Sequence, residues 1–184
     1  MTIISYIVLA LAVGIQVLLS MRDCAEQTPI QLNKGLLHSA ILAIIFIMMM
    51  GLGIWTANIF LPSYPEDVAK MVTLGIFLVV IAKIFFGTKK ASNVSAYDIS
   101  RPGTMVLLSI ALGINVFLLG LGVGFVGQFE SDLLKMAIPM FLLVFPMSMW
   151  GIMLGRNKID IRPRRWRLIS VLCLLVVAVV STLL

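Results

Sequence analysis

The chain has 184 residues, of which 61% are hydrophobic and only 12% are charged. A typical globular domain has about 25% charged residues, so this composition excludes a water-soluble fold, which could not bury so much apolar surface. The net charge of +6 does not indicate nucleic-acid binding, because the basic residues stand between apolar runs instead of forming one basic face. We therefore expect an integral membrane protein that contacts the lipid bilayer and no nucleic acid.

Six apolar runs follow one another along the chain, each near the 20 or so residues that a helix needs to cross a bilayer core about 30 Å thick. We predict an all-α membrane protein with spanning helices over 2–21, 36–61, 70–87, 104–127, 133–155 and 168–184. Pro62, Pro65, Pro102 and Pro163 punctuate the breaks. No basic segment precedes the first run and no small-x-small cleavage site follows it, so we expect it to stay in the mature protein.

The connections between the runs differ in charge. Twelve of the fourteen Lys and Arg residues lie in or beside the first, third and fifth connections: Arg22, Lys34, Lys83, Lys89, Lys90, Arg101, Arg156, Lys158, Arg162, Arg164, Arg165 and Arg167. Cytoplasmic connections retain such residues, so we predict that both termini lie outside the cytoplasm. The four arginines over 162–167 are the main topology determinant, and they also suit contact with anionic lipid.

Parts of the first half of the chain recur in the second half. Residues 14–17 match 113–116 at an offset of 99, whereas 36–41 match 133–138 and 78–80 match 175–177 at an offset of 97. Each copy holds three spans, so the second copy would enter the membrane from the opposite side, as in the inverted repeats of many secondary transporters. We predict one transmembrane domain over 1–184 with repeats in 1–90 and 101–184. Convergence of two apolar triplets is the alternative.

Two polar residues lie deep inside spans and occupy equivalent positions in the repeats, Gln16 in the first span and Asn115 in the fourth. An inverted two-fold axis would bring them face to face near the bilayer centre. Their carbonyl oxygens could then ligate a metal ion, or their amides could bind a polar solute. Ser20 follows Gln16 on the same helix face, and we expect all three residues in a substrate path. Alternatively, the two amides only join neighbouring helices.

Pro146 and Met49 are assigned to the same path. Proline removes a backbone hydrogen bond and frees a carbonyl, and such breaks often border transporter binding sites, although a simple kink is the alternative. Met49 belongs to a group of methionines in the second and fifth spans whose sulfur could bind Cu(I). Because no Cys or His stands at ligand spacing, packing is the favoured role for these methionines.

Five glycines are predicted at contacts between helices. Small residues spaced four or seven apart let helices approach closely in lipid, and this spacing is found for Gly113, Gly120, Gly124, Gly151 and Gly155.

The sequence predicts no enzyme activity and no cofactor. It has no phosphate-binding GxxxxGK, no nucleophile elbow and no HExxH. Cys24, Cys173 and His38 are too scattered for a disulfide framework or a usual zinc site. Without a P-loop, any transport should be driven by a gradient.

Three segments carry a family resemblance: Ala111-Leu112-Gly113-Ile114-Asn115-Val116 followed by Gly120-x-Gly122-x-Gly124-Phe125, then Met149-Trp150-Gly151-Ile152-Met153-Leu154-Gly155-Arg156, and Gly53-Ile54-Trp55. In these the chain resembles the MntP-type manganese efflux pumps within the LysE-like exporter group. The resemblance covers nearly the whole chain. It implies a multi-pass protein of the bacterial inner membrane, with six spans in two inverted three-helix halves, that exports manganese.

The chain departs from that family at the ion site. Members carry an aspartate at the positions of Gln16 and Asn115, and a further acidic residue at about Ile47. Manganese(II) prefers carboxylate oxygen, and neutral amides offset none of its charge. The first reading is therefore an exporter of a manganese-like divalent cation with an amide pair in place of the acidic site. The alternatives are an exporter of a small polar or zwitterionic solute, and a non-transporting scaffold or regulatory protein. A homodimer is compatible with each.

Overall fold

The computed structural model describes residues 3–28, 30–60, 65–86, 101–126, 129–159 and 161–183, without the side chains within 129–133 and 182–183. Over these residues the chain forms α1 (Ile3–Gln27), α2 (Leu32–Phe60), α3 (Glu66–Phe86), α4 (Pro102–Val126), α5 (Phe129–Arg156) and α6 (Pro163–Leu183). The predicted all-α class with six helices is confirmed. The predicted span limits at 2, 61, 87, 127 and 184 lie outside the described residues, as do Lys89 and Lys90.

Five of the helices, α1 to α5, are long and apolar enough to cross a membrane. This makes the chain a multi-pass membrane protein. The predicted sixth span, 168–184, corresponds to α6, which is helical but begins with Arg164, Arg165 and Arg167 and is not among those five. That this helix also crosses the bilayer stays a prediction.

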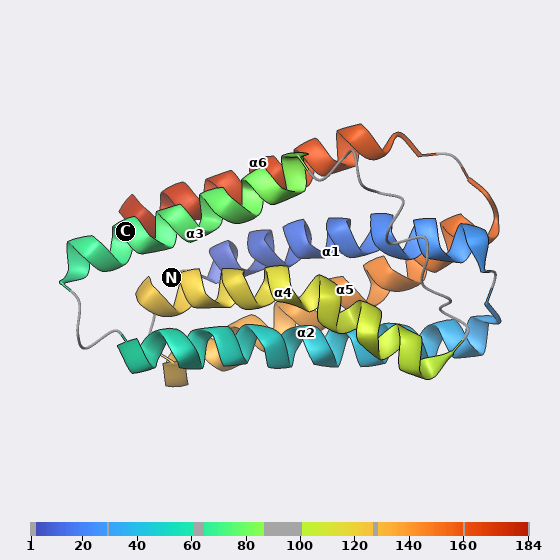
Figure 1. The fold of residues 1–184 in the computed structure, drawn as a ribbon, viewed down its shortest axis with the longest axis horizontal. Helices are drawn as coiled ribbons and strands as arrows, with labels where there is room; N and C mark the ends of the chain where they lie inside the picture. Colours follow the sequence, from blue (N-terminus) through green and yellow to red (C-terminus); the bar gives the residue numbers. More distant parts are fainter. Residues whose placement is uncertain are drawn as a thin grey trace.

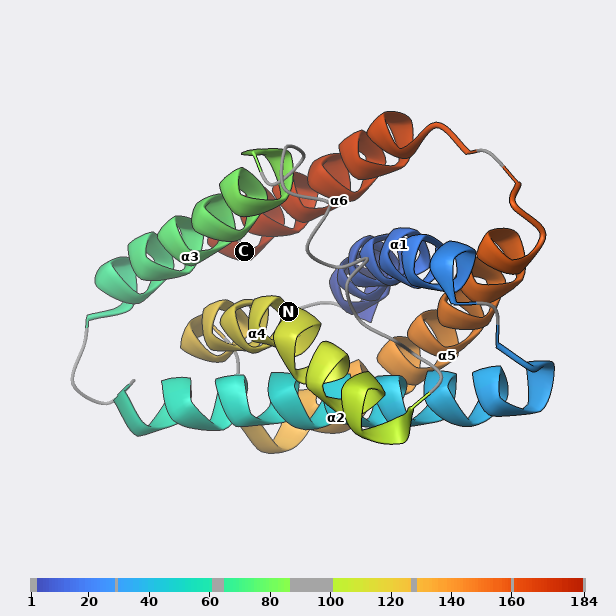
Figure 2. The same cartoon turned by 45° about the vertical axis from the view of Figure 1, so that its right-hand side comes forward.

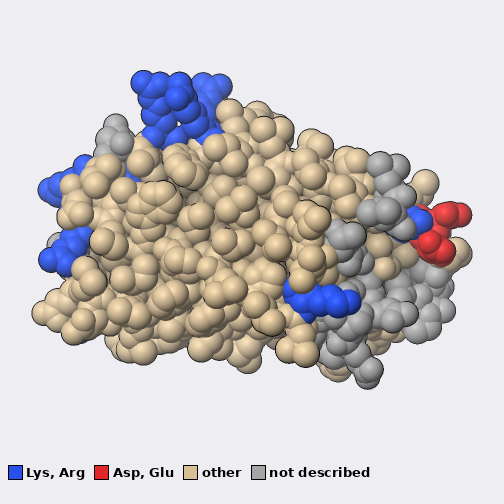
Figure 3. Space-filling view, turned by 180° about the vertical axis from the view of Figure 1, so that it is seen from behind, with Lys and Arg blue, Asp and Glu red and all other residues tan. Residues whose placement is uncertain are grey.

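The outer surface of the bundle is an apolar band between two charged ends. Many large apolar side chains are exposed, among them Met71 at 76% and Ile4 at 68%. Exposing so much apolar surface to water would be unfavourable, so this surface suits a lipid environment. Figure 3 shows the band on one face of the molecule, with Lys and Arg gathered at one end and a cluster of acidic side chains, beside further Lys or Arg, toward the other. Both described chain ends lie at the end opposite the α1–α2 and α5–α6 connections (Figure 1).

The six helices are arranged in three layers of two. In Figure 2, α1 and α4 lie between the pair of α3 and α6 on one side and the pair of α2 and α5 on the other. The closest partners of α1 are α5 and α6, and those of α4 are α2 and α3; in addition α2 packs on α5 and α3 on α6. These main pairings stay the same if each helix is exchanged with its counterpart in the other half of the chain, α1 with α4, α2 with α5 and α3 with α6.

Local sequence signals account for the helix ends. Proline at the first helical position begins α4 at Pro102 and α6 at Pro163, because its missing N–H has no partner there in any case. At the end of α5, Lys158 adopts a positive φ of 50°. The amides of Lys158 and Ile159 then bond back to the carbonyls of Gly155 and Leu154. This reversal stops the helix and directs the chain toward α6.

Glycines let α1 approach α5 and α4 approach α2. A Cβ atom on Gly151 would collide with the backbone of Leu18, and one on Gly53 would collide with the backbone of Phe117. The helices can therefore pack this closely only where no side chain intervenes.

The other predicted packing glycines lie in the same two interfaces. Gly120 lies against the backbone of Met50, Gly124 against Ile54 and Ala57, and Gly155 against Arg22 and Ala25. Sequence reasoning missed two members of the set, Gly14 and Gly53.

Candidate functional site in the middle layer

Gln16 connects α1 to α6. Its Nε2 donates a hydrogen bond to Ser170 Oγ at 3.1 Å, and Ser170 Oγ donates to the carbonyl of Ala12 at 2.9 Å. Ser170 is fully buried and Gln16 is partly buried. Within the described residues the Gln16 side-chain carbonyl accepts no hydrogen bond. The Gln16 side chain is thus held through its Nε2 atom, and its Oε1 atom could accept a hydrogen bond from another group.

Asn115 connects α4 to α3. Lys83 Nζ donates a hydrogen bond of 2.6 Å to Asn115 Oδ1. A second contact joins the same two helices, because Thr73 Oγ1 donates to the carbonyls of Ala69 and Gly122 at 2.9 and 3.0 Å. An ammonium group has three N–H donors, so Lys83 keeps donors for a further acceptor. The long side chain of Lys83 therefore places a positive charge next to the Asn115 amide, which was expected to have only neutral neighbours.

The two amides do not form a pair with each other in this structure. Gln16 bonds to α6 and Asn115 bonds to α3, and α6 and α3 pack on one another as the adjoining layer. Both side chains therefore extend from the middle layer and bond to the layer formed by α3 and α6. Each of these contacts links a helix of one half of the chain to a helix of the other. The face-to-face approach of the two amides stays a prediction.

The remaining residues assigned to the path have varied surroundings. Ser20 is partly buried one turn beyond Gln16, whereas Pro146 is exposed within α5, which is continuous through it. Met49 packs against Gly113, where an added Cβ would meet Met49 Cγ at 3.0 Å. Met49 thus fills the space that this glycine leaves.

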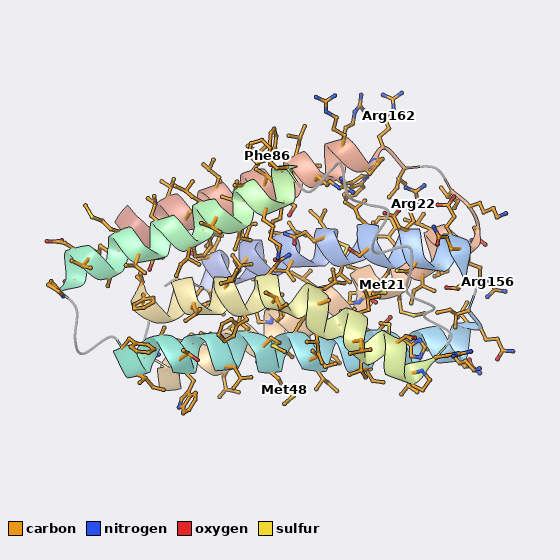
Figure 4. The ribbon with its side chains drawn as sticks, in the orientation of Figure 1. Met21, Arg22, Met48, Phe86, Arg156 and Arg162 are labelled. Atoms are coloured by element: carbon orange, nitrogen blue, oxygen red, sulfur yellow. The ribbon has the colours of Figure 1, made fainter. Side chains whose placement is uncertain are left out.

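Acidic side chains are sparse around these contacts. Among the described residues, no three His, Cys, Asp or Glu lie close enough together to hold a metal ion. At the charged end of α1, Arg22 is buried, donates to the Ile161 carbonyl at 3.4 Å and lies 3.7 Å from Glu26. Figure 4 shows this arginine beneath the start of α6, well along α1 from its first turn.

Sequence reasoning missed the partners of the two amides. Ser170 lies close to the arginine-rich start of the sixth run, and Lys83 was considered only as one of the basic residues beside the third connection. A second buried pair, Ser39 Oγ donating to Ser148 Oγ at 2.9 Å, joins α2 to α5. A search for every hydroxyl inside a span would have found the serines, but only the fold brings them together.

The fold and these polar contacts define a helical multi-pass membrane protein whose polar side chains link helices from the two halves of the chain. No protein-family model, curated protein or solved structure matches the chain.

Proposed function

We propose that the protein is a secondary transporter for a small polar solute that carries a carboxylate, with a neutral amino acid as the simplest example. The observation that carries this proposal is the Lys83–Asn115 hydrogen bond of 2.6 Å between α3 and α4. Lys83 is exposed in the last turn of α3, but its ammonium group reaches an amide inside the apolar run of α4, and charged groups that face such positions often serve a substrate path. Here the charge is the Lys83 ammonium group, which is bonded to Asn115, the amide first considered as a metal ligand.

The donors and acceptors at the two contacts suit a zwitterion. The Lys83 ammonium offers free N–H donors for a carboxylate, and the Gln16 carbonyl offers an acceptor for an ammonium group. A divalent cation at Asn115 would be repelled by Lys83, and two amides would offset none of its charge. Export of a manganese-like cation is the second candidate, which the segments resembling the manganese pumps favour.

The interfaces on either side of the middle layer support the inverted repeat as part of this proposal. The glycine contacts relate α1 to α4 at an offset of 99, and α2 to α5 at an offset of 98, which is one more than the 97 of the sequence match. By this rule the contact of Gly14 with Met147 and Leu143 corresponds to that of Gly113 with Met49 and Ile45. The rule likewise relates Gly151–Leu18 to Gly53–Phe117 and Gly155–Ala25 to Ala57–Gly124.

The third helix of each half does not follow the same rule. With the offset of 97 for α3 and α6, the counterpart of Gln16–Ser170 is Asn115–Thr73, but Asn115 bonds to Lys83. The register differs by ten residues, or about 15 Å at 1.5 Å per residue. In Figure 1, α3 and α6 are displaced together toward the end where the chain termini lie. We interpret this as one of two positions of a sliding α3–α6 unit on a fixed scaffold of four helices.

Transport measurements with the purified protein test the substrate class. Proteoliposomes are loaded with a radiolabelled mixture of neutral amino acids or with Mn²⁺, and protein-dependent efflux is followed against empty liposomes. We expect amino-acid efflux, with a loss of at least about tenfold in Asn115→Ala and Lys83→Met, since each change removes a charge-assisted contact. Mn²⁺ efflux should equal that of empty liposomes.

The matched control for the charge is Lys70→Met. Lys70 is paired with Glu66 at 3.0 Å on the opposite end of α3, away from both amides, so it should keep wild-type efflux. Protein-dependent Mn²⁺ efflux that Asn115→Ala abolishes would replace the proposed solute by a divalent cation. If neither probe moves, the transporter proposal is overturned in favour of a scaffold role.

A further inference from the structure

An open pocket of about 660 Å³ lies where the end of α3 meets the start of α6. Its volume is within the range of pockets that hold small ligands. One wall is a single face of α6, formed by Arg164, Arg167, Leu168 and Val171, and the other is the end of α3, with Phe85 and Phe86. None of the residues in the hydrogen bonds of Gln16 and Asn115 lines the pocket, although Ile84 and Val171 of its lining are next in sequence to Lys83 and Ser170.

The α6 wall of the pocket is strongly electropositive. Arg164 and Arg167 are one turn apart, so their guanidinium groups share a face. The helix begins at Pro163, and its unpaired N-terminal amides add a partial positive charge at the same place. No Asp or Glu is among the described lining residues; the nearest acid with a known influence is Asp23, which interacts electrostatically with Arg167. These features favour an anion at the mouth of the pocket.

The other wall favours a hydrocarbon chain. Phe86 is 74% exposed and Leu168 is 42% exposed, so the pocket walls belong to the apolar surface that faces lipid. Figure 4 places Phe86 at the end of α3, close to the start of α6, while Arg162 at the same helix start points away from the bundle. A soluble anion would leave the aromatic wall uncovered, whereas a lipid would cover it.

We propose that this pocket binds an anionic phospholipid, with its phosphate on Arg164 and Arg167 and the upper part of an acyl chain against Phe85, Phe86 and Leu168. Arginine pairs with phosphate through two parallel hydrogen bonds, and basic pockets between membrane helices recognise anionic headgroups. The pocket joins α3 to α6 at one end, so the bound lipid connects the two helices of this layer.

The test measures thermal unfolding of the purified protein in a non-ionic detergent. Dioctanoyl phosphatidylglycerol, dioctanoyl phosphatidylcholine and inorganic phosphate are titrated separately. We expect a saturable rise in unfolding temperature with phosphatidylglycerol alone. The double variant R164Q/R167Q should weaken this response about 25-fold, from roughly fivefold for each arginine. R164Q alone, which leaves Arg167 beside Asp23, should weaken it roughly fivefold.

The matched control is R162Q/R165Q, which removes the same charge from the same helix start but from residues that do not line the pocket. It should keep the wild-type response. An equal rise with phosphatidylcholine, or an equal loss in the control variant, would overturn the pocket as an anionic-lipid site. An equal rise with inorganic phosphate would overturn the lipid as its occupant.

Discussion

Ser170 has a small side chain that makes two hydrogen bonds between α6 and α1. Its hydroxyl accepts from Gln16 and donates to the Ala12 carbonyl, so one oxygen atom ties two turns of α1 to α6. We predict that Ser170→Ala lowers the free energy of unfolding by about 1 kcal/mol, because interhelical hydrogen bonds in membranes are worth about this much. Unfolding in mixed micelles of increasing SDS fraction measures the change.

Ser109→Ala is the companion variant for this measurement. Ser109 is also fully buried, but its hydroxyl bonds to the Met105 carbonyl within its own helix. It should unfold near the wild-type SDS fraction. If both serine variants lose the same stability, the Ser170 contact contributes nothing beyond a buried hydroxyl, and Gln16 does not fasten α1 to α6.

At this scale the sequence located polar residues but not their partners. Gln16 and Asn115 could be chosen because an amide inside an apolar run is unusual, and both take part in interhelical bonds. The choice of partner depends on how far α3 and α6 are displaced along the middle layer, which no local pattern encodes. Lys83 illustrates the point, because its position near a helix end gave no reason to expect it beside Asn115.

At the scale of helices, the apolar runs predicted the elements well and their lengths less well. Both ends of α5 extend past the predicted span of 133–155, and α1 continues six residues beyond 21. Helices continue into the charged boundary because their backbone bonds remain favourable outside the hydrocarbon. Pro146 was considered as a break, yet it lies inside the continuous helix α5, as does Pro139.

The two glycine interfaces allow a prediction about equivalent positions. Gly53→Ala and Gly151→Ala should each cost roughly 2 kcal/mol of unfolding free energy, because each new methyl group would overlap backbone of the facing helix. The two losses should be similar, since the contacts correspond. SDS titration of the folded protein measures both variants.

Gly75→Ala provides the reference for a helical glycine without a neighbour. An added Cβ at Gly75 has open space around it, and alanine is the better helix former, so stability should stay the same or increase. A loss at Gly53 alone, with Gly151→Ala unchanged, would contradict the equivalence of the α1–α5 and α2–α4 interfaces.

At the scale of the whole molecule, the register of α3 on α4 differs from that of α6 on α1. This difference leads to a specific prediction of a second conformation. If the halves exchange their registers, α3 advances by ten residues on α4 and α6 retreats by ten on α1. Both displacements point the same way along the bundle, because α3 and α6 run in opposite directions (Figure 1). The two helices can therefore move in the same direction, and each must also rotate by about 80°, because ten residues are about 2.8 helical turns.

The proposed second conformation would have contacts of its own, which disulfide trapping can detect. In a background of Cys24→Ala and Cys173→Ala, the pair Q16C/S170C reports the register observed here. The pair Q16C/V180C reports the exchanged one. Val180 lies ten residues beyond Ser170, so in the observed register it is about 15 Å from reach, whereas a disulfide requires Cα atoms within about 7 Å. We expect both pairs to cross-link in native membranes.

The opposite half of the chain supplies an independent check on the same motion. T73C/N115C should cross-link in the exchanged register, whereas M71C/N115C should not in either, because Met71 is 76% exposed on the far side of α3. A sliding unit must bring Thr73 to Asn115 whenever it brings Val180 to Gln16. Cross-links restricted to Q16C/S170C would mean that the register difference is a fixed asymmetry of the fold, and the α3–α6 layer would then serve as a wall of the bundle rather than its moving part.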